Sequence, residues 1–217
     1  MSNNEFSKIE GVKRKMSELR DLKIEGIGSS YGGEYNRVNL EGITTIKDNL
    51  KCMYFSSQGM CKCEAELNAD DVRVEGTFKA KGNIRAKKVN IEGIAKLEDH
   101  SINADEINAE GVIKCNELSA DNIKIDGVCR AEKIFGESIE INPKLGKKTG
   151  LFDFFNNSDI SKVSLIECTE LKADGLSADT IRASKVKLGR YCEINLIEYS
   201  EIADIHPEAK IKELIKI

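Results

Sequence analysis

The chain has 217 residues, of which 40% are hydrophobic, 32% charged and only 6% aromatic. This composition is typical of a folded protein and excludes a disordered or collagen-like chain, while the scarcity of rings argues against a core built from large aromatic side chains. The 33 basic and 37 acidic residues leave a net charge of −4, so no strongly basic field points to a nucleic-acid binder.

Residues 1–20 form a polar segment in which Phe6, Ile9, Met16 and Leu19 recur near helical spacing. We expect an amphipathic segment here that is able to cap the structure that follows. It has no apolar leader region, and no stretch of the chain approaches the roughly 18 apolar residues of a membrane span. A cytoplasmic location without direct membrane insertion is therefore expected.

Residues 21–142 contain an internal repeat. An acidic residue followed by glycine recurs every 16 to 18 residues, with Gln58 in place of the acid at one step. The glycines are Gly26, Gly42, Gly59, Gly76, Gly93, Gly111 and Gly127. Within each period the apolar residues form three pairs with one polar residue inside each pair, for example Leu67/Ala69, Val72/Val74 and Phe78/Ala80. A spacing of two indicates a short strand with alternating faces.

The spacing between the pairs predicts the fold class. Steps of about five or six residues from pair to pair are too short for a hairpin or a crossover helix, so the chain must turn a corner after each strand. Three corners close one turn, and turns stacked at about 4.8 Å form three parallel sheets around a narrow interior. The chain is therefore predicted to be all-β, a triangular parallel β-helix of about 17 residues per turn, with a structural glycine at one corner.

Outward positions of the same repeat carry two columns of charge. The acidic column precedes the glycine and contains Glu25, Glu41, Glu75, Glu92, Glu110 and Asp126. The basic column lies three residues after the glycine and contains Lys62, Lys79, Lys96, Lys114 and Arg130. The columns are interpreted as a solvated wall, and the alternative is lateral pairing or partner docking through complementary stripes.

Cysteine and histidine are the residues best able to carry chemistry. Because they share the inward phase of the third strand, Cys61, Cys63, Cys115 and Cys129 are interpreted as reduced core thiols and not as zinc ligands. His100 lies in an acidic stretch that is interpreted as a solvated turn and not as an acid–base cluster. We therefore expect no enzyme activity, no catalytic, cofactor-binding or metal-binding residue, and no cofactor.

Residues 143–162 break the period with Pro143, two glycines and a polar run. We expect an irregular insertion outside the stack of turns. Its large apolar residues, Phe152, Phe154 and Phe155 among them, would either contact a partner or fold back over a sheet face as a local cover.

The apolar pattern resumes in residues 163–217 with a shorter step. Pairs such as Leu171/Ala173 and Leu176/Ala178 recur every five residues. Further turns of the same solenoid are expected, although a pentapeptide-repeat helix has a similar step. Residues 211–217 are expected to form a last strand or a short capping helix.

The phased pattern V-x-[VIL]-x-G-x-x-x-[ACL], together with IEGIGSSYGGEYNRVNLEG at residues 24–42, resembles the bactofilins, a polymer-forming bacterial cytoskeletal family. The resemblance covers residues 21–142 well and 163–205 loosely. It implies a right-handed triangular β-helix that assembles end to end into filaments without nucleotide. It also implies a role in cell shape, motility or the placement of cell-wall enzymes.

Self-assembly is the expected function, because the unpaired strand edges at the two ends of a solenoid are templates for another chain. The residues expected at the ends are Leu22 and Ile24 in the first turn and Ile197 and Ile202 near the last. The expected partners are further copies of the chain and other cytoskeletal or cell-wall proteins. Two alternatives stay open: a pentapeptide-like module that binds a protein by mimicking the shape and charge of nucleic acid, and a β-helix acyltransferase, whose strict six-residue repeat the observed period does not match.

Overall fold

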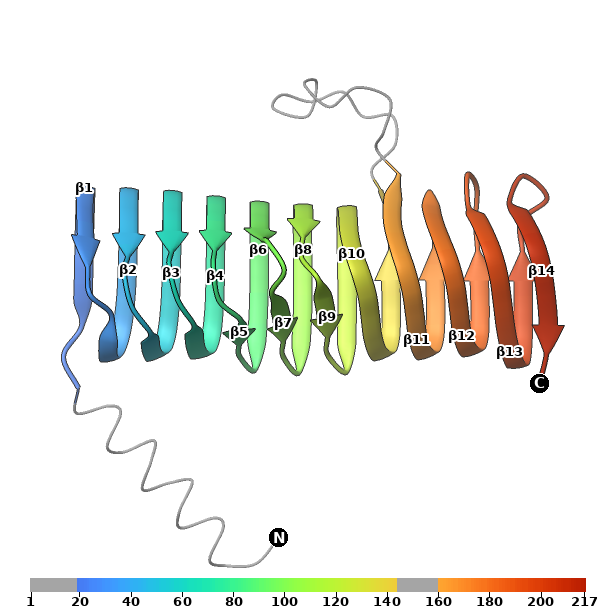
Figure 1. Ribbon diagram of the computed structural model, residues 1–217, viewed down its shortest axis with the longest axis horizontal. Coiled ribbons are helices and arrows are strands. Elements are labelled where there is room, and N and C mark those ends of the chain that lie inside the picture. The colour runs from blue at the N-terminus through green and yellow to red at the C-terminus, as the bar shows by residue number, and fades with distance from the viewer. Residues whose placement is uncertain (1–18, 144–159) are drawn as a thin grey trace, which may run out of the picture.

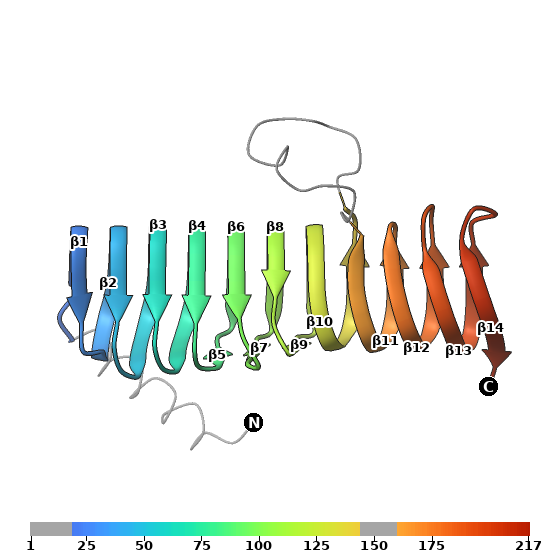
Figure 2. The same cartoon turned by 45° about the horizontal axis from the view of Figure 1, so that its top comes forward.

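The computed structural model describes residues 19–143 and 160–217, and this part of the chain is a parallel β-solenoid without helices (Figure 1). About 11 turns of about 17 residues follow one another. A second view, turned by 45°, shows the turns still in one straight row, so the stack is a rod with its first and last turns at opposite ends (Figure 2). The predicted all-β parallel β-helix is confirmed.

All strands belong to one sheet in which successive turns pair in parallel. The strands are β1 (Leu22–Ser30), β2 (Gly33–Ile46), β3 (Leu50–Cys63), β4 (Leu67–Ala80), β5 (Ile84–Arg85), β6 (Lys88–Leu97), β7 (Ser101–Asn103), β8 (Glu106–Lys114), β9 (Glu117–Ser119), β10 (Asn122–Ile141), β11 (Ser161–Ala173), β12 (Leu176–Leu188), β13 (Glu193–Ile205) and β14 (Lys210–Lys216). The longer strands continue around corners, and β10 runs through more than one full turn.

The register reproduces the repeat that the sequence contains. Gly26, Gly42, Gly59, Gly76, Gly93, Gly111 and Gly127 are Cα partners in successive turns. The spacing of these glycines is therefore the length of each turn.

The stacked corner needs glycine because it brings the backbones of successive turns into contact. Gly76 has a φ of +104°, and a Cβ added to it would lie 2.4 Å from the carbonyl oxygen of Gly59. Gly93 approaches Gly76 in the same way, with 2.2 Å between the added Cβ and the carbonyl oxygen. An L-residue with a side chain fits neither this backbone conformation nor this space.

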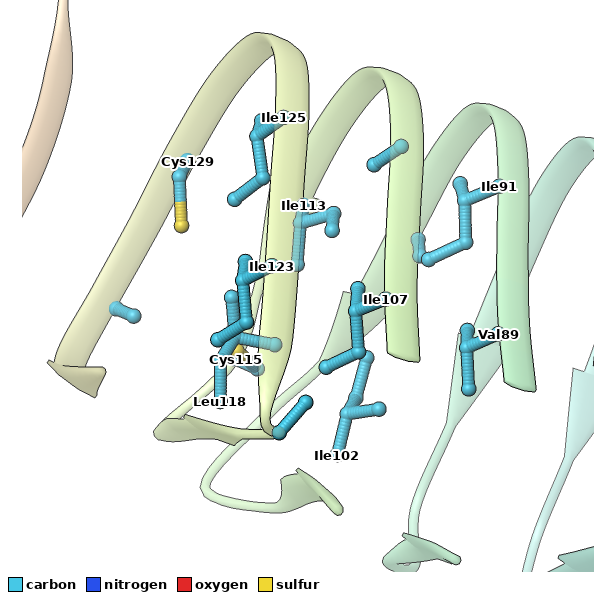
Figure 3. Close-up of a cluster of buried hydrophobic side chains, with 14 of the residues drawn as sticks. Val89, Ile91, Ile102, Ile107, Ile113, Cys115, Leu118, Ile123, Ile125 and Cys129 are labelled. Carbon is cyan, nitrogen blue, oxygen red and sulfur yellow. The ribbon is translucent and has the colours of Figure 1, made fainter. Parts of the chain in front are cut away.

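Inward side chains from the three faces of each turn fill the lumen. In one turn they are Leu50, Cys52, Phe55, Ser57, Cys61 and Cys63, all of them buried. Further along, aliphatic side chains such as Ile91, Ile107 and Ile123 point inward from neighbouring strands (Figure 3). Phe55 and Phe78 are in edge-to-face contact inside the lumen, with ring centroids 5.7 Å apart. Dispersion and apolar burial in these columns hold the turns together alongside the backbone ladders.

The chain leaves and rejoins the stack at the glycine corner. Residues 144–159 lie outside the described residues, and with them Phe152, Phe154 and Phe155; the N-terminal segment up to residue 18 does so as well. Where the chain returns, the hydroxyl Oγ of Ser161 accepts a hydrogen bond of 3.0 Å from the backbone N–H of Cys129. This buried hydroxyl satisfies a backbone donor at the interruption. Ser161 and Lys162, which were expected in the insertion, belong to β11.

The five-residue step of the C-terminal part also builds three-sided turns. Ser161 pairs with Leu176, and Val163 pairs with Ala178, so one turn here takes 15 residues, or three such steps. The later turns are longer again, with Glu193 paired to Lys210. The chain ends in the strand β14, so the strand alternative for residues 211–217 is confirmed and the capping helix is not formed.

The glycine corner generates a stability prediction. Gly76→Ala places a Cβ against the Gly59 carbonyl and should lower the free energy of unfolding by at least ~2 kcal/mol, since both the positive φ and the close contact are violated. Gly26→Ala is the matched control, because an added Cβ there meets no atom within 4 Å and only its φ of +79° is unfavourable. Thermal unfolding followed by circular dichroism measures both. Equal losses in the two variants would contradict the contact argument.

Candidate assembly surfaces

The N-terminal end of the solenoid is formed by β1. Leu22 and Ile24 occupy inward positions, paired with the buried Val38 and Leu40 of the next turn, and both are half-buried. Among the described residues, no strand pairs with the other edge of β1. The two residues predicted for this end therefore lie in the first turn, as expected.

The C-terminal end is formed by β14 and by the last residues of β13. Ile197 is fully buried because Leu214 of β14 pairs over it, so its ladder is already continued within the chain. The role expected for Ile197 at the open end passes to Leu214, which is 47% exposed, and to the half-buried Ile211. Sequence reasoning missed these two residues because it left open whether this segment was a strand.

Ile202 lies in the terminal turn but on its outer wall. It pairs with Lys185, an outward position, and its side chain is 57% exposed. The inward residues of this edge are Ala203 and Ile205, which continue the columns of the buried Val186 and Leu188. Because β14 pairs with β13 only as far as Tyr199, residues 202–205 have no outer strand among the described residues.

The first and last turns present their three faces in the same order. The faces are residues 22–24, 28–30 and 33–35 at the first turn, and residues 203–205, 209–211 and 214–216 at the last. The central outward residue of the first of these faces is Lys23 at one end and Asp204 at the other, so the charges are opposite.

The two predicted charge columns are present on the wall. Successive members of the acidic column are Cα partners, with Gln58 in the vacant step, and so are successive members of the basic column. Lys162 adds a sixth cation, because it pairs with Arg130. A surface hollow of about 360 Å³ follows this column and is lined by Lys114, Arg130 and Lys162, together with carboxylates such as Asp179.

The two columns differ in how far their charges are paired within the chain. Arg73 Nε lies 2.8 Å from Glu75 Oε1, and another guanidinium nitrogen lies 3.6 Å from Glu92. By contrast, Lys79, Lys96 and Lys114 are exposed and have no carboxylate within ion-pair distance among the described residues. The basic column is therefore a ladder of largely unneutralised cations.

The cysteines line the lumen, and burial raises the pKa of their thiols. The pKa is about 12 for Cys115 and Cys168 and about 11 for Cys61, and it lies well above the ordinary value for Cys129. The predicted inward position of the four cysteines singled out by the sequence is confirmed. Within residues 19–143 and 160–217, no three His, Cys, Asp or Glu side chains are grouped so that they could hold a metal ion. His100 lies at a corner just before β7, where its carbonyl accepts a hydrogen bond from Asn116 N–H.

The thiol environment predicts slow modification. At pH 8 a pKa near 12 leaves roughly a thousandfold less thiolate than an ordinary cysteine has, and the lumen also blocks access. An aromatic disulfide reagent should therefore label native protein slowly and label all seven cysteines at once in denaturant. Cys168 is the one that is not fully buried, so Cys168→Ser should remove the fastest phase of the reaction. Rapid labelling of Cys61 or Cys129 in folded protein would contradict this assignment.

No helix in the part of the chain that the structure describes is long and apolar enough to cross a membrane.

Comparison of the chain with protein-family models, with curated proteins and with solved structures found no match.

Proposed function

We propose that this chain is a structural, self-assembling protein of the bactofilin kind, which polymerises through the ends of its solenoid and scaffolds cell-shape, motility or cell-wall processes in the cytoplasm. The observation that carries the proposal is that strand edges and half-buried lumen side chains occur together at both ends of the described stack. An uncovered strand edge offers unpaired backbone donors and acceptors, and an uncovered lumen offers apolar area.

A second copy stacked in the same direction places its residues 22–24, 28–30 and 33–35 over residues 203–205, 209–211 and 214–216 of the first. Ala203 and Ile205 of one copy then face Leu22 and Ile24 of the next, in the same arrangement that inward pairs have inside the rod. Asp204 lies beside Lys23 at this junction. The junction therefore gains backbone hydrogen bonds, apolar burial and an opposite-charge pair, and it needs no nucleotide or other cofactor.

The proposal assigns no catalytic step to the chain. A rod that repeats the same wall over many turns is suited to holding several partner molecules at a regular spacing. The proposed partners are further copies of the chain, with cytoskeletal or cell-wall proteins bound along the wall.

Blocking one end tests this function. Leu214→Lys places a charge on the partly exposed last lumen position and should weaken assembly at least tenfold, because the ammonium group must be desolvated at the junction. Tyr54→Lys is the matched control: this side chain is 44% exposed, but it lies on the wall of β3, two strands in from the N-terminal edge and far from the C-terminal end. Light scattering and electron microscopy measure the particles formed.

Head-to-tail stacking predicts that the Leu214→Lys chain forms no particle longer than one rod, because every junction requires a C-terminal end. Particles two rods long in electron micrographs would indicate that N-terminal ends join each other instead. A wild-type chain that stays monomeric at all concentrations and forms no filaments would overturn the proposed function.

A further inference from the structure

An exposed aliphatic column runs along the wall beside the glycine corner. Its members directly follow the stacked glycines and are Cα partners in successive turns: Ile27, Ile43, Met60, Thr77, Ile94, Val112 and Val128, named here the aliphatic ridge. Ile27 is 85% exposed, Ile43 52% and Met60 53%, and the others are half-buried. Single exposed apolar residues are ordinary, but a column that is apolar in six of seven successive turns, with its first three members exposed, is a patch of the kind that marks a contact surface.

The corner itself does not require aliphatic side chains at these positions. Thr77 occupies the fourth position of the ridge with a hydroxyl, so a polar group fits there. The lumen is filled from the other face of the strand and gains nothing from the ridge. The apolar character is therefore best explained by something outside the described residues.

The ridge lies midway between the acidic and basic columns. In one turn Glu92 precedes Ile94 by two residues and Lys96 follows it by two, and the neighbouring turns repeat this order. At each level, a carboxylate thus lies on one side of the ridge and a cation on the other. The distance along the rod between successive members is the same in both columns, because both columns belong to the same turns.

The cations of the basic column need an external anion more than the carboxylates need a cation. Lys79, Lys96 and Lys114 are stacked at about 4.8 Å and repel one another, and no carboxylate of the described part neutralises them. A partner that neutralises all of them must carry anions at the same spacing. The carboxylates in the acidic column of a second copy have this spacing. The phosphates along one strand of a DNA helix are about 3.4 Å apart along the axis, so they do not stay aligned with the cations.

We propose that two copies of this chain pair side by side and in parallel through the aliphatic ridge, with the basic column of each facing the acidic column of the other. Parallel pairing about a two-fold axis along the ridge places unlike columns opposite each other on both sides. Antiparallel pairing places acid against acid and base against base, which is repulsive over several turns. The charge pattern therefore decides the orientation, and it holds equivalent residues at the same height.

The lateral pairing goes beyond end-to-end assembly and does not depend on it. It uses the wall and leaves both ends free, so it yields a two-stranded filament when the ends join and a parallel dimer when they are blocked. All tests are therefore made on the full chain carrying Leu214→Lys, in which failure of end joining leaves lateral pairing measurable.

Cysteine cross-linking tests the orientation. The native thiols are buried in the lumen, with Cys168 as the partly exposed exception, so the chain without an added cysteine defines the background. Ile43→Cys on the ridge should give a covalent dimer with a short bismaleimide, because each Ile43 meets its equivalent across the two-fold axis. Tyr54→Cys, which is exposed on the neighbouring strand β3 but lies off the ridge, is the matched control and should give none.

An antiparallel pair instead brings Ile43 close to Val112, four levels along the ridge. A mixture of Ile43→Cys and Val112→Cys chains that cross-links only as the mixed pair would overturn the parallel arrangement. Absence of any covalent dimer above background, both from Ile43→Cys alone and from the mixture, would overturn lateral pairing itself.

Charge reversal tests the columns. The variant Lys79→Glu with Lys96→Glu carries acid on both sides of the ridge, and the variant Glu75→Lys with Glu92→Lys carries base on both sides. Each alone should pair at least tenfold more weakly than the parent, and an equimolar mixture should restore pairing, with sedimentation velocity as the readout. A mixture that stays monomeric overturns the proposal. Binding of a fluorescent single-stranded oligonucleotide that requires Lys79 and Lys96, without pairing of the parent, would assign the column to a polyanion instead.

Discussion

The close approach of stacked corner glycines is the constraint on which the rest of this structure depends. At this corner the carbonyl of one turn lies where a Cβ of the next would be, as between Gly59 and Gly76. Because each glycine must lie directly over the previous one, the register of every turn is set at one point. The inward alternation, the lumen columns and the wall columns all follow from that register, since a shift of one residue would turn each side chain to the opposite face.

Because the same register recurs in every turn, equivalent residues are stacked into ladders along the rod. In the lumen this is favourable, because like aliphatic side chains pack on one another and small ones such as Ala95 accommodate large neighbours such as Phe78. On the wall it is costly for charge, because like charges come to lie on adjacent strands. The acidic column offsets this cost within the chain through residues such as Arg73, whereas in the basic column Lys62 pairs with Glu64 but Lys79, Lys96 and Lys114 have no carboxylate partner among the described residues. Because of this difference, the wall is a candidate surface for partner binding as well as the ends.

The interruption and the C-terminal turns show how far the pattern can change while the solenoid continues. The chain leaves the stack at the glycine corner, where β10 ends. At the point of return, the hydroxyl of Ser161 accepts a hydrogen bond from the backbone N–H of Cys129. A turn of 15 residues then follows without loss of pairing, because three five-residue steps still place one inward pair on each face. The corner that carries glycine in the first turns is therefore also the corner at which the chain accommodates an insertion and a change in turn length, since this corner lies outside the lumen.

The amino-acid sequence alone determined the period, the three inward pairs per turn, the corner glycines, the charge columns and the burial of the cysteines. These features are local and repeat, so spacing in the chain translates directly into position. Only the tertiary structure decided which residues form the ends and which wall residues remain exposed. Ile197 and Leu214 have similar sequence surroundings, yet the first is buried and the second open, because β14 pairs over one and nothing in the described chain pairs over the other. The aliphatic ridge was equally hidden among apolar residues in the sequence, because exposure depends on which side of the sheet a corner residue takes after the glycine bend.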